Sequence, residues 1–316
     1  MASVNTYPPT ELARLVSQAG VAKSRLSYPE FAIKSFIGGV FISFGALTDL
    51  VIASGSPGLR ESNPALATMI AGFTFPLGFV LIMLTNMELV TSSMFVMPFT
   101  WFQRKITLVD VVKNWVLGYI GNLAGALFVA GFLAWWTDTL STDAETDYAV
   151  TQAEGRVNVQ WSANFLRGIG CNWFVALASF LSLGSVEFVS KIYCIWIPIW
   201  AFVILGYQHS IANFFQVPIG MFYGTNFGVG KFIYQSIIPV TLGNIVGGTI
   251  FGAMVFWYLY GRHDESHEKE NSLDSDREAD HAAKEMEGGT ALGVSHARNG
   301  SVYGGPYDRN SMTGAV

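Results

Sequence analysis

The sequence predicts an all-α membrane protein with six transmembrane helices in two inverted three-helix repeats, the second and fifth helices being broken. Three observations carry this prediction: the composition, the presence of two apolar runs too long for one helix, and the recurrence of a short motif. Of the 316 residues, 51% are hydrophobic and 13% are charged, whereas soluble domains carry about 25% charged residues. This is the composition of a membrane protein, and no basic stripe supports nucleic-acid binding.

The apolar runs divide the chain into membrane crossings, each of which needs roughly 20 residues. Two runs, 65–102 and 190–222, are too long for one straight helix and contain a polar cluster each, at 85–93 and 206–213. Non-helical backbone at membrane depth is tolerated only where it is buried in protein or lines a watery cavity. We therefore expect both breaks to line a path, and we expect unbroken crossings over 31–54, 107–136, 161–184 and 233–261.

The polar segments predict the topology. Residues 1–30 form an N-terminal segment with basic residues just before the first crossing, and the connection 137–160 is acidic. Because Lys and Arg accumulate on cytoplasmic flanks, both termini are expected in the cytoplasm and the acidic loop outside. Beyond the transporter-like body 31–261, residues 262–316 are polar and charged with few aliphatic residues. Such a segment cannot bury enough apolar surface to fold, so a disordered cytoplasmic tail is expected.

An internal repeat supports the two-half architecture. The motif 121–125 (Gly-Asn-Leu-Ala-Gly) recurs at 243–247 as Gly-Asn-Ile-Val-Gly, in the third and sixth crossings. In each half the motif follows a broken crossing that follows an unbroken one. Because three crossings per half is an odd number, the second half enters the membrane with opposite polarity, and the two broken helices meet near the midplane. Thr91 and His209 are thereby expected to lie together.

His209 is the leading candidate functional residue, since an ionisable side chain inside membrane-embedded sequence marks a substrate or proton path. Its expected neighbours, Thr91, Asn172 and Asn213, are uncharged, and a permanent positive charge at that depth would trap an anion. An imidazole can donate a hydrogen bond or a proton to the anion of a weak acid. A small monovalent anion therefore fits better than a cation. Glu88 is expected to bind backbone amides of its own loop.

Five motifs follow one another along the chain: Gly39–Ser43, Glu88 with Val90–Ser93, Lys113–Gly125, Gln208–Asn213 and Ile238–Ile245. Their order and identity resemble the formate/nitrite transporter family, and the long apolar body with a polar tail resembles its fungal nitrite transporter branch. The resemblance covers about 23 to 261.

This resemblance implies an aquaporin-like protomer in a homopentamer embedded in the lipid bilayer, with one pore in each protomer and no cofactor or metal. It implies that Thr91, His209, Asn172 and Asn213 line the pore. The apolar constrictions would be formed by Phe75, Phe79 and Val90 on one side and by Val175 and Phe202 on the other. Arg156 would lie in the outer vestibule; the alternative is a solvated loop charge.

The expected function is nitrite transport across the plasma membrane, linked to protons through His209. Bacterial formate channels resemble one another in having glutamate before the histidine, and Gln208 stands there in this sequence, which favours nitrite over formate. A channel for formate, lactate or another monocarboxylate is the alternative. A neutral-solute pore of aquaporin type is disfavoured by the absence of paired Asn-Pro-Ala motifs and of an arginine filter. An enzyme is disfavoured because no nucleophile–base pair or phosphate-binding loop is present.

Overall fold

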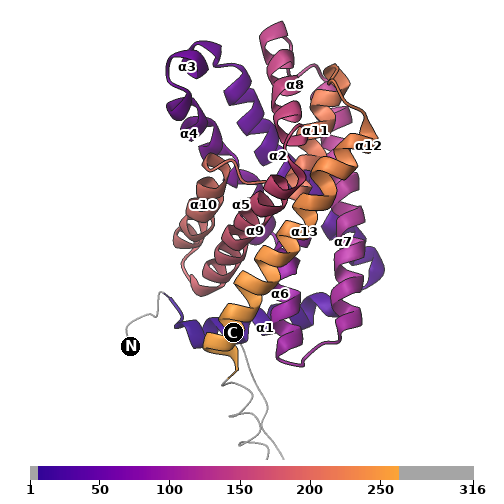
Figure 1. Cartoon of the computed structure of the whole chain (residues 1–316). Coiled ribbons are helices and arrows are strands. Elements are labelled where there is room, and N and C mark those ends of the chain that lie inside the picture. The colour runs from indigo at the N-terminus through magenta and orange to yellow at the C-terminus, as the bar shows by residue number, and fades with distance from the viewer. Residues whose placement is uncertain (1–5, 263–316) are drawn as a thin grey trace, which may run out of the picture. The chain divides into compact units, whose positions relative to one another are not determined.

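The computed structural model describes residues 6–262, and within that range the chain is built from helices (Figure 1). The predicted disordered tail therefore lies outside the described residues except for Arg262, and the division into 1–30, 31–261 and 262–316 stays a prediction. Five helical stretches of the described range are long and apolar enough to cross a membrane. The multi-pass membrane architecture predicted from composition is thus confirmed.

The four unbroken crossings have nearly the bounds expected from the apolar runs. The first is α2 (Tyr28–Ser54), and the fourth is α9 (Trp161–Gly184). The third consists of α7 (Leu108–Phe128) and the π-helical continuation η1 (Val129–Trp135). The sixth is a continuous helical stretch made of α12 (Val229–Phe232), η2 (Ile233–Ile237), α13 (Ile238–Val246), η3 (Gly247–Met254) and η4 (Trp257–Gly261).

The second and fifth crossings are broken, as predicted, but the breaks are shorter than the polar clusters. The second crossing runs through α4 (Pro64–Thr74), α5 (Pro76–Leu84) and α6 (Val90–Phe102). The fifth consists of α10 (Phe188–Ile204) and α11 (Ser210–Tyr223). The non-helical segments are therefore 85–89 and 205–209. The polar residues that follow each break form the first turn of a helix instead of extending the break.

Three helices lie outside the crossings: α1 (Pro9–Ser24), α3 (Pro57–Ser62) and α8 (Asp143–Val157). The expectation that 137–160 is an acidic loop was wrong, because α8 occupies most of it. Thr142 accepts a hydrogen bond from the backbone of Glu145 while Glu145 bonds back to the Thr142 backbone, which is a capping box. A Ser/Thr-x-x-Glu pattern of this kind marks a helix start in sequence.

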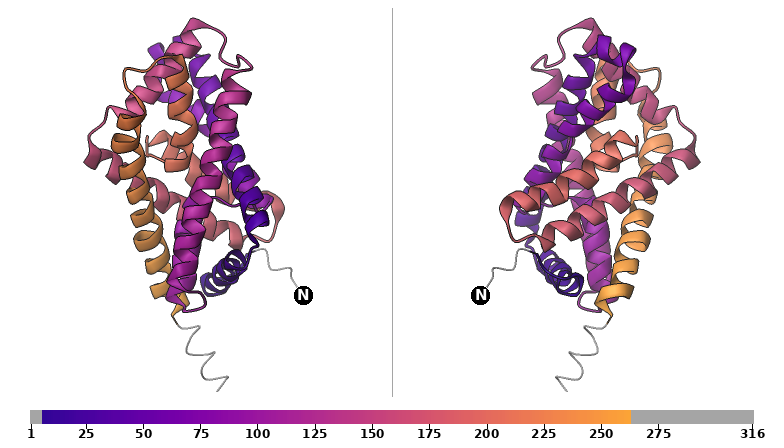
Figure 2. Two further views of the ribbon diagram at one scale, coloured as in Figure 1. Left: turned by 90° about the vertical axis from the view of Figure 1, so that its right-hand side faces the viewer. Right: turned by 90° about the vertical axis from the view of Figure 1, so that its left-hand side faces the viewer.

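The two described ends of the chain lie at one end of the helical body, as an even number of crossings requires (Figures 1 and 2). There, Leu12 and Val16 of α1 pack in one buried cluster with Phe95 and Phe99 of α6. The segments α3 and α8 lie at the opposite end (Figure 2). The helix α1 therefore covers the end of the helical body at which α6, the last helix of the second crossing, ends.

The recurring motif makes equivalent contacts in the two halves. In the first half, α7 packs on α2 so closely that a methyl group at Gly125 would overlap the carbonyl oxygen of Phe36. In the second half, the sixth crossing packs on α9, and a methyl group at Gly247 would overlap the carbonyl oxygen of Ile169. Small residues at membrane helix contacts allow such close backbone approach. The repeat is therefore a packing motif that holds the third helix of each half against the first.

Candidate functional site

Two asparagines from the repeated motif cap the two half-helices that begin at the breaks. Asn122 Oδ1 accepts a hydrogen bond of 2.9 Å from Val90 N, and Asn244 Oδ1 accepts one of 2.9 Å from Ser210 N. The amide groups of the same two side chains donate to carbonyl oxygens of the breaks, at Glu88 and Gln208. Because the first N–H groups of a helix have no partner inside it, these caps determine where α6 and α11 start.

Thr91 and His209 meet where the two half-helices begin. Thr91 Oγ1 lies 2.8 Å from His209 Nε2, and both residues are buried. The other ring nitrogen, Nδ1, accepts a hydrogen bond of 3.0 Å from Ala212 N and so caps α11. Because Nδ1 is an acceptor, the proton of the neutral imidazole resides on Nε2 and is donated towards Thr91. The centre of the structure therefore holds a neutral hydrogen-bond donor fixed by the fold.

Asn172 lies beside this pair and links the two halves. Its amide donates to Thr91 O at 3.1 Å and to Asn244 O at 2.8 Å, and the side chain is fully buried. The amide also contacts Met94 Sδ of α6 at 3.9 Å, so all of its partners belong to α6 and α13. In this arrangement Asn172 holds the helix that carries Thr91.

A cavity of about 330 Å³ opens next to His209 on the side of α8. Arg156 of α8 reaches into this region, and its Nη1 donates to Gln208 Oε1 at 3.2 Å and to Asn213 Oδ1 at 3.4 Å. Asn213 also donates to Gln208 Oε1 at 3.1 Å. Arg156 is therefore not a solvated loop charge. Arg167, a second basic residue, also lines the cavity.

Two of the five predicted constriction residues form an aromatic pair at the floor of this cavity. The rings of Phe75 and Phe202 meet edge to face with centroids 5.9 Å apart, and Phe202 stacks on His209 at 6.2 Å. The grouping of Phe75 with Phe79 and Val90 in one constriction stays a prediction, and the ring contact pairs Phe75 with Phe202. Phe75 lies between α4 and α5, just before Pro76, and its ring contacts Phe202 of α10 from there.

The remaining constriction candidates, Phe79, Val90 and Val175, are buried in one hydrophobic cluster. That cluster also contains Leu89, which is 1% exposed and precedes α6 as His209 precedes α11. The two residues have nearly the same backbone angles, φ −120° and ψ 121° for Leu89 and φ −111° and ψ 117° for His209. When the two breaks are aligned by the helices that follow them, α6 and α11, Leu89 takes the position equivalent to His209. The periodicity of the sequence alone does not identify Leu89 as a candidate site residue.

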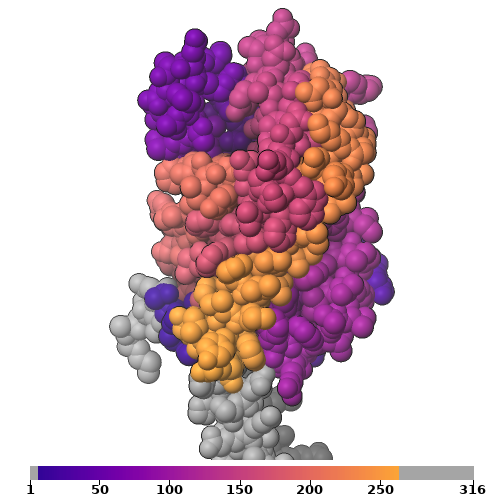
Figure 3. All heavy atoms as spheres, viewed as in Figure 1, coloured from indigo at the N-terminus to yellow at the C-terminus, as the bar shows by residue number. Residues whose placement is uncertain are grey.

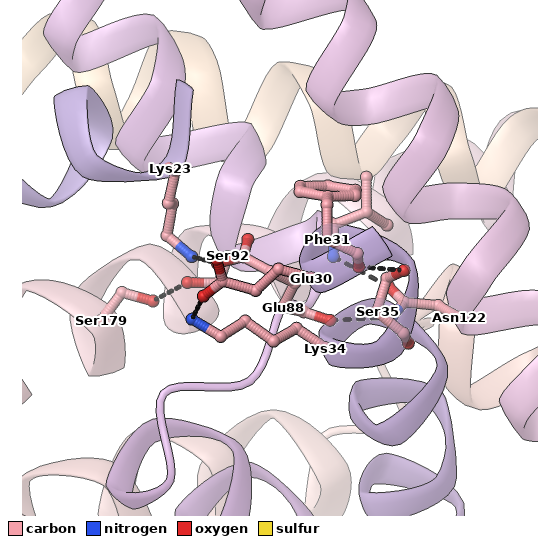
Figure 4. Close-up of polar contacts among 10 residues, drawn as sticks. Lys23, Glu30, Phe31, Lys34, Ser35, Glu88, Ser92, Asn122 and Ser179 are labelled. Carbon is pink, nitrogen blue, oxygen red and sulfur yellow. Dashed lines mark hydrogen bonds and ion pairs between the residues drawn. The ribbon is translucent and has the colours of Figure 1, made fainter. Parts of the chain in front are cut away.

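The break before α6 is held by a buried ion pair at the end of the body that carries α1 (Figure 4). Lys23 Nζ of α1 lies 2.7 Å from Glu88 Oε1, and the Glu88 side chain is 3% exposed. The expectation that Glu88 binds amides of its own loop was wrong. Those amides are occupied elsewhere: Glu88 N donates to Lys34 O, and Val90 N donates to Asn122. Ser92 binds Ser179 of α9 at 3.0 Å.

The described residues contain no group of three or more His, Cys, Asp or Glu side chains arranged to hold a metal ion. What the site offers is a central neutral donor between two polar regions of unequal charge. On the α1 side a carboxylate and an ammonium are paired. On the α8 side two arginines, Arg156 and Arg167, line a cavity beside a neutral Gln208.

The family model described as "Formate/nitrite transporter" matches residues 10–258. The chain is 36% identical over 269 residues to a protein of Methanothermobacter thermautotrophicus named "Probable formate transporter", covering 80% of this chain and 96% of that protein. It is also 36% identical over 260 residues to a protein named "Formate channel BtFdhC" of Bacillus thuringiensis, covering 80% and 96%.

Solved structures are similar over most of the chain. One, titled "Pentameric formate channel with formate bound", has a TM-score of 0.65 and 25% identity and covers 74% of this chain and 97% of that one. Another, titled "FNT family ion channel", has a TM-score of 0.72 and 23% identity and covers 79% and 99%. The fold with two inverted repeats and two broken helices is thus shared with known membrane channels.

Proposed function

Because the chain belongs to the formate/nitrite transporter family, we propose that it conducts a small monovalent anion of a weak acid through a pore centred on Thr91 and His209. The observation that carries the proposal is the hydrogen bond between these two residues at the meeting point of the two broken helices. Asn172 and Asn213 serve as polar residues of this path. Phe75, Phe202, Phe79, Val90, Val175 and Leu89 narrow it.

The central imidazole is the hydrogen-bond donor to the anion in this proposal. Its Nε2–H points at the Thr91 hydroxyl, which lets an arriving anion exchange its hydrogen bond with one of the two groups. An anion that passes the apolar constrictions is stabilised by accepting this hydrogen bond. A proton that the anion takes up from the surrounding solution lets it cross as the neutral acid, which avoids the cost of an unpaired charge in an apolar setting. Nδ1 is held by Ala212 N, so the ring keeps its orientation during the exchange.

Formate is the first candidate substrate, because relatives that are 36% identical are named for formate. Nitrite is the second candidate, and a specific observation favours it. Gln208 stands where bacterial formate channels resemble one another in having glutamate, and its Oε1 accepts from Arg156. A neutral amide leaves the approach to His209 more positive than a carboxylate would, which suits nitrite, the anion of the stronger acid. Lactate and other larger monocarboxylates are the remaining members of this class.

We further propose a homopentamer in the plasma membrane with the α1 end in the cytoplasm. The pentamer is supported by the similarity to a chain titled as a pentameric formate channel. The orientation is supported by basic residues near the α1 end, including Lys34, Arg104 and Lys113, because positive residues favour the cytoplasmic side. Arg156 and the cavity that it borders then face outside, as the entry for the anion.

Uptake of labelled formate and of labelled nitrite into liposomes containing the purified protein tests this function, with and without an inward proton gradient. His209→Asn is the sharpest variant, because an asparagine oxygen can take over the cap of α11 from Nδ1 while the Nε2–H is lost. Gradient-driven uptake is expected in the parent and lost in His209→Asn. His209→Ala, which removes both the cap and the donor, is expected to lose it too. Full gradient-driven uptake by a well-folded His209→Asn protein would contradict the assigned role.

A further inference from the structure

The two breaks carry equivalent cations whose partners differ in charge. On the inner side Lys23 is paired with the carboxylate of Glu88. On the outer side Arg156 occupies the corresponding position and contacts the neutral amide of Gln208. Glu88 and Gln208 are equivalent by their own contacts, since each donates its N–H to a carbonyl of the first helix of its half, at Lys34 and Arg167. Arg156 therefore contacts a neutral amide at the position where Lys23 contacts a carboxylate.

A second cavity, of about 400 Å³, lies beside the one that reaches His209 and shares Gln152, Arg156 and Val203 with it. It lies among α2, α4 and α8, where Figure 3 shows a hollow between the violet segment that carries α3 and α4 and the pink helix α8. Its wall contains one carboxylate, that of Asp49 from α2. Arg156 thus stands between two chambers, with Gln208 on one side and Asp49 on the other.

Asp49 is 6% exposed, and the part of the chain that the structure describes gives it no ion pair within 4.0 Å, so its charge acts through space. Arg60, the other cation on this wall, is already engaged: it donates to the carbonyls of Ala53 and Ser54 and lies 4.1 Å from the centre of the Tyr148 ring. Arg156 is less committed, because its Nε is buried without a hydrogen-bond partner. Burial lowers the pKa of the Arg156 guanidinium, and the negative charge of Asp49 opposes that effect.

We propose that Asp49 is the counter-charge of Arg156 and takes the place of the carboxylate that position 208 lacks. It is a positioning residue for the anion path: by offsetting the charge of Arg156 from behind, it keeps the outer anion site weak enough for release towards His209. Conduction requires an entry site that attracts the ion without trapping it. The proposal rests on the proposed function, since it assigns the strength of the outer site of the same pore.

The test measures the half-saturating anion concentration and the maximal uptake rate separately, for formate and for nitrite, in liposomes. Asp49→Asn removes the charge with little change of shape, Gln208→Glu places a carboxylate beside Arg156, and the double variant moves the charge from α2 to the break. Asp49→Glu keeps the charge. Asp147→Asn is the matched control, because it removes a carboxylate from the exposed face of α8, next to Tyr148 in the sequence but outside the lining of both cavities.

Asp49→Asn is expected to lower the half-saturating concentration by about threefold to tenfold, the effect of one charge acting through a partly polar medium, and to lower the maximal rate. Gln208→Glu alone is expected to raise the half-saturating concentration. The double variant is expected to return to the parent value, while Asp49→Glu and Asp147→Asn stay close to it. A purely structural role for Asp49 predicts no such rescue.

An unchanged or raised half-saturating concentration in Asp49→Asn overturns the inference, as does a double variant that does not return to the parent value. If neither Asp49→Asn nor the double variant yields particles of the parent size by size-exclusion chromatography, a structural role suffices and the inference also fails. Failure of the proposed function is separate, because it would appear as absence of small-anion uptake in the unmodified protein.

Discussion

The break before α6 and the break before α11 are built on one plan and differ in charge. In each break an asparagine of the repeated motif caps the following helix, and a backbone N–H of the break donates to the first helix of its half. In each break the side chain of a basic residue also contacts the residue at the equivalent position, Glu88 or Gln208. The inner break uses a closed ion pair of Lys23 with Glu88. The outer break leaves Arg156 on a neutral amide beside two cavities.

An inverted repeat can therefore give its two halves the same backbone structure while the charges around the two breaks differ. We call the regions around Lys23 and Glu88 and around Arg156 and Gln208 the inner and the outer mouth of the pore. The inner cation, Lys23, belongs to α1, outside the repeat, and the carboxylate of Glu88 neutralises its charge directly. The outer cation, Arg156, belongs to α8, between the repeats; it has no carboxylate in contact, and in our proposal Asp49 offsets its charge only in part. In the orientation that we propose, this asymmetry favours loading of the anion outside and its release inside, since a positive entry attracts the anion and a neutral exit does not hold it.

Removal of the two cations has the largest expected effect and separates the mouths most clearly. Lys23→Ala leaves the buried carboxylate of Glu88, whose Oε2 already lacks a partner, without its counter-ion, and is expected to destabilise the protein by about 3–5 kcal/mol. Arg156→Ala removes hydrogen bonds to the neutral side chains of Gln208 and Asn213, while Asp49 makes no ion pair within 4.0 Å in the described residues and interacts with Arg156 only through space. It is expected to cost about 1–2 kcal/mol. The decrease in apparent melting temperature of each variant, followed by tryptophan fluorescence in detergent, measures the two losses of stability.

The control for this pair is Lys23→Ala combined with Glu88→Gln, which removes both charges of the inner mouth. It is expected to recover most of the stability lost in Lys23→Ala, because no buried charge is left uncompensated. Equal destabilisation by Lys23→Ala and Arg156→Ala, or no recovery in the combined variant, would show that the inner ion pair does not distinguish the two mouths.

The two asparagine caps provide the complementary test, since here the halves are expected to behave alike. Asn122→Ala leaves Val90 N and the carbonyls of Glu88 and Ser35 without this partner, and Asn244→Ala does the same to Ser210 N and the carbonyls of Gln208 and Gly168. Each variant is expected to lose about 1–3 kcal/mol, because a buried polar group left unsatisfied costs that much. Thermal unfolding of the two variants side by side measures whether the losses match.

How far the sequence predicts this fold depends on the range of the interactions involved. Crossing lengths and the existence of two breaks follow from local composition, so the first and fourth crossings at 31–54 and 161–184 were predicted to within three residues of α2 and α9. The lengths of the breaks do not follow locally. They are decided by Asn122 and Asn244, which cap helices 32 and 34 residues earlier in the chain.

The site shows the same limit. The inverted repeat predicted that the two breaks meet, and Thr91 and His209 are in hydrogen-bonding contact. By contrast, the pairing of Glu88 with Lys23 joins residues 65 positions apart and depends on where α1 docks, which no periodicity encodes. The contact of Phe75 with Phe202 joins the second and fifth crossings and likewise has no local signal in the sequence. The helix α8, and with it the placement of Arg156, was missed although its capping box is visible in the sequence.

The smallest expected effect concerns the seam between the two halves, where Tyr119 of α7 and Thr241 of α13 share a hydrogen bond of 2.6 Å. Because both side chains belong to third helices of their halves, this bond joins the repeats directly, close to Val90 and Met94 of α6. Tyr119→Phe keeps the ring and its edge-to-face contact with Phe214, whose centroid lies 5.0 Å away. It is therefore expected to cost only about 0.5–1.5 kcal/mol and to leave the two mouths unequal as before. Melting temperature and anion half-saturation measured on one preparation check this, and a loss as large as that of Asn122→Ala would place the coupling of the halves at this seam instead of at the caps.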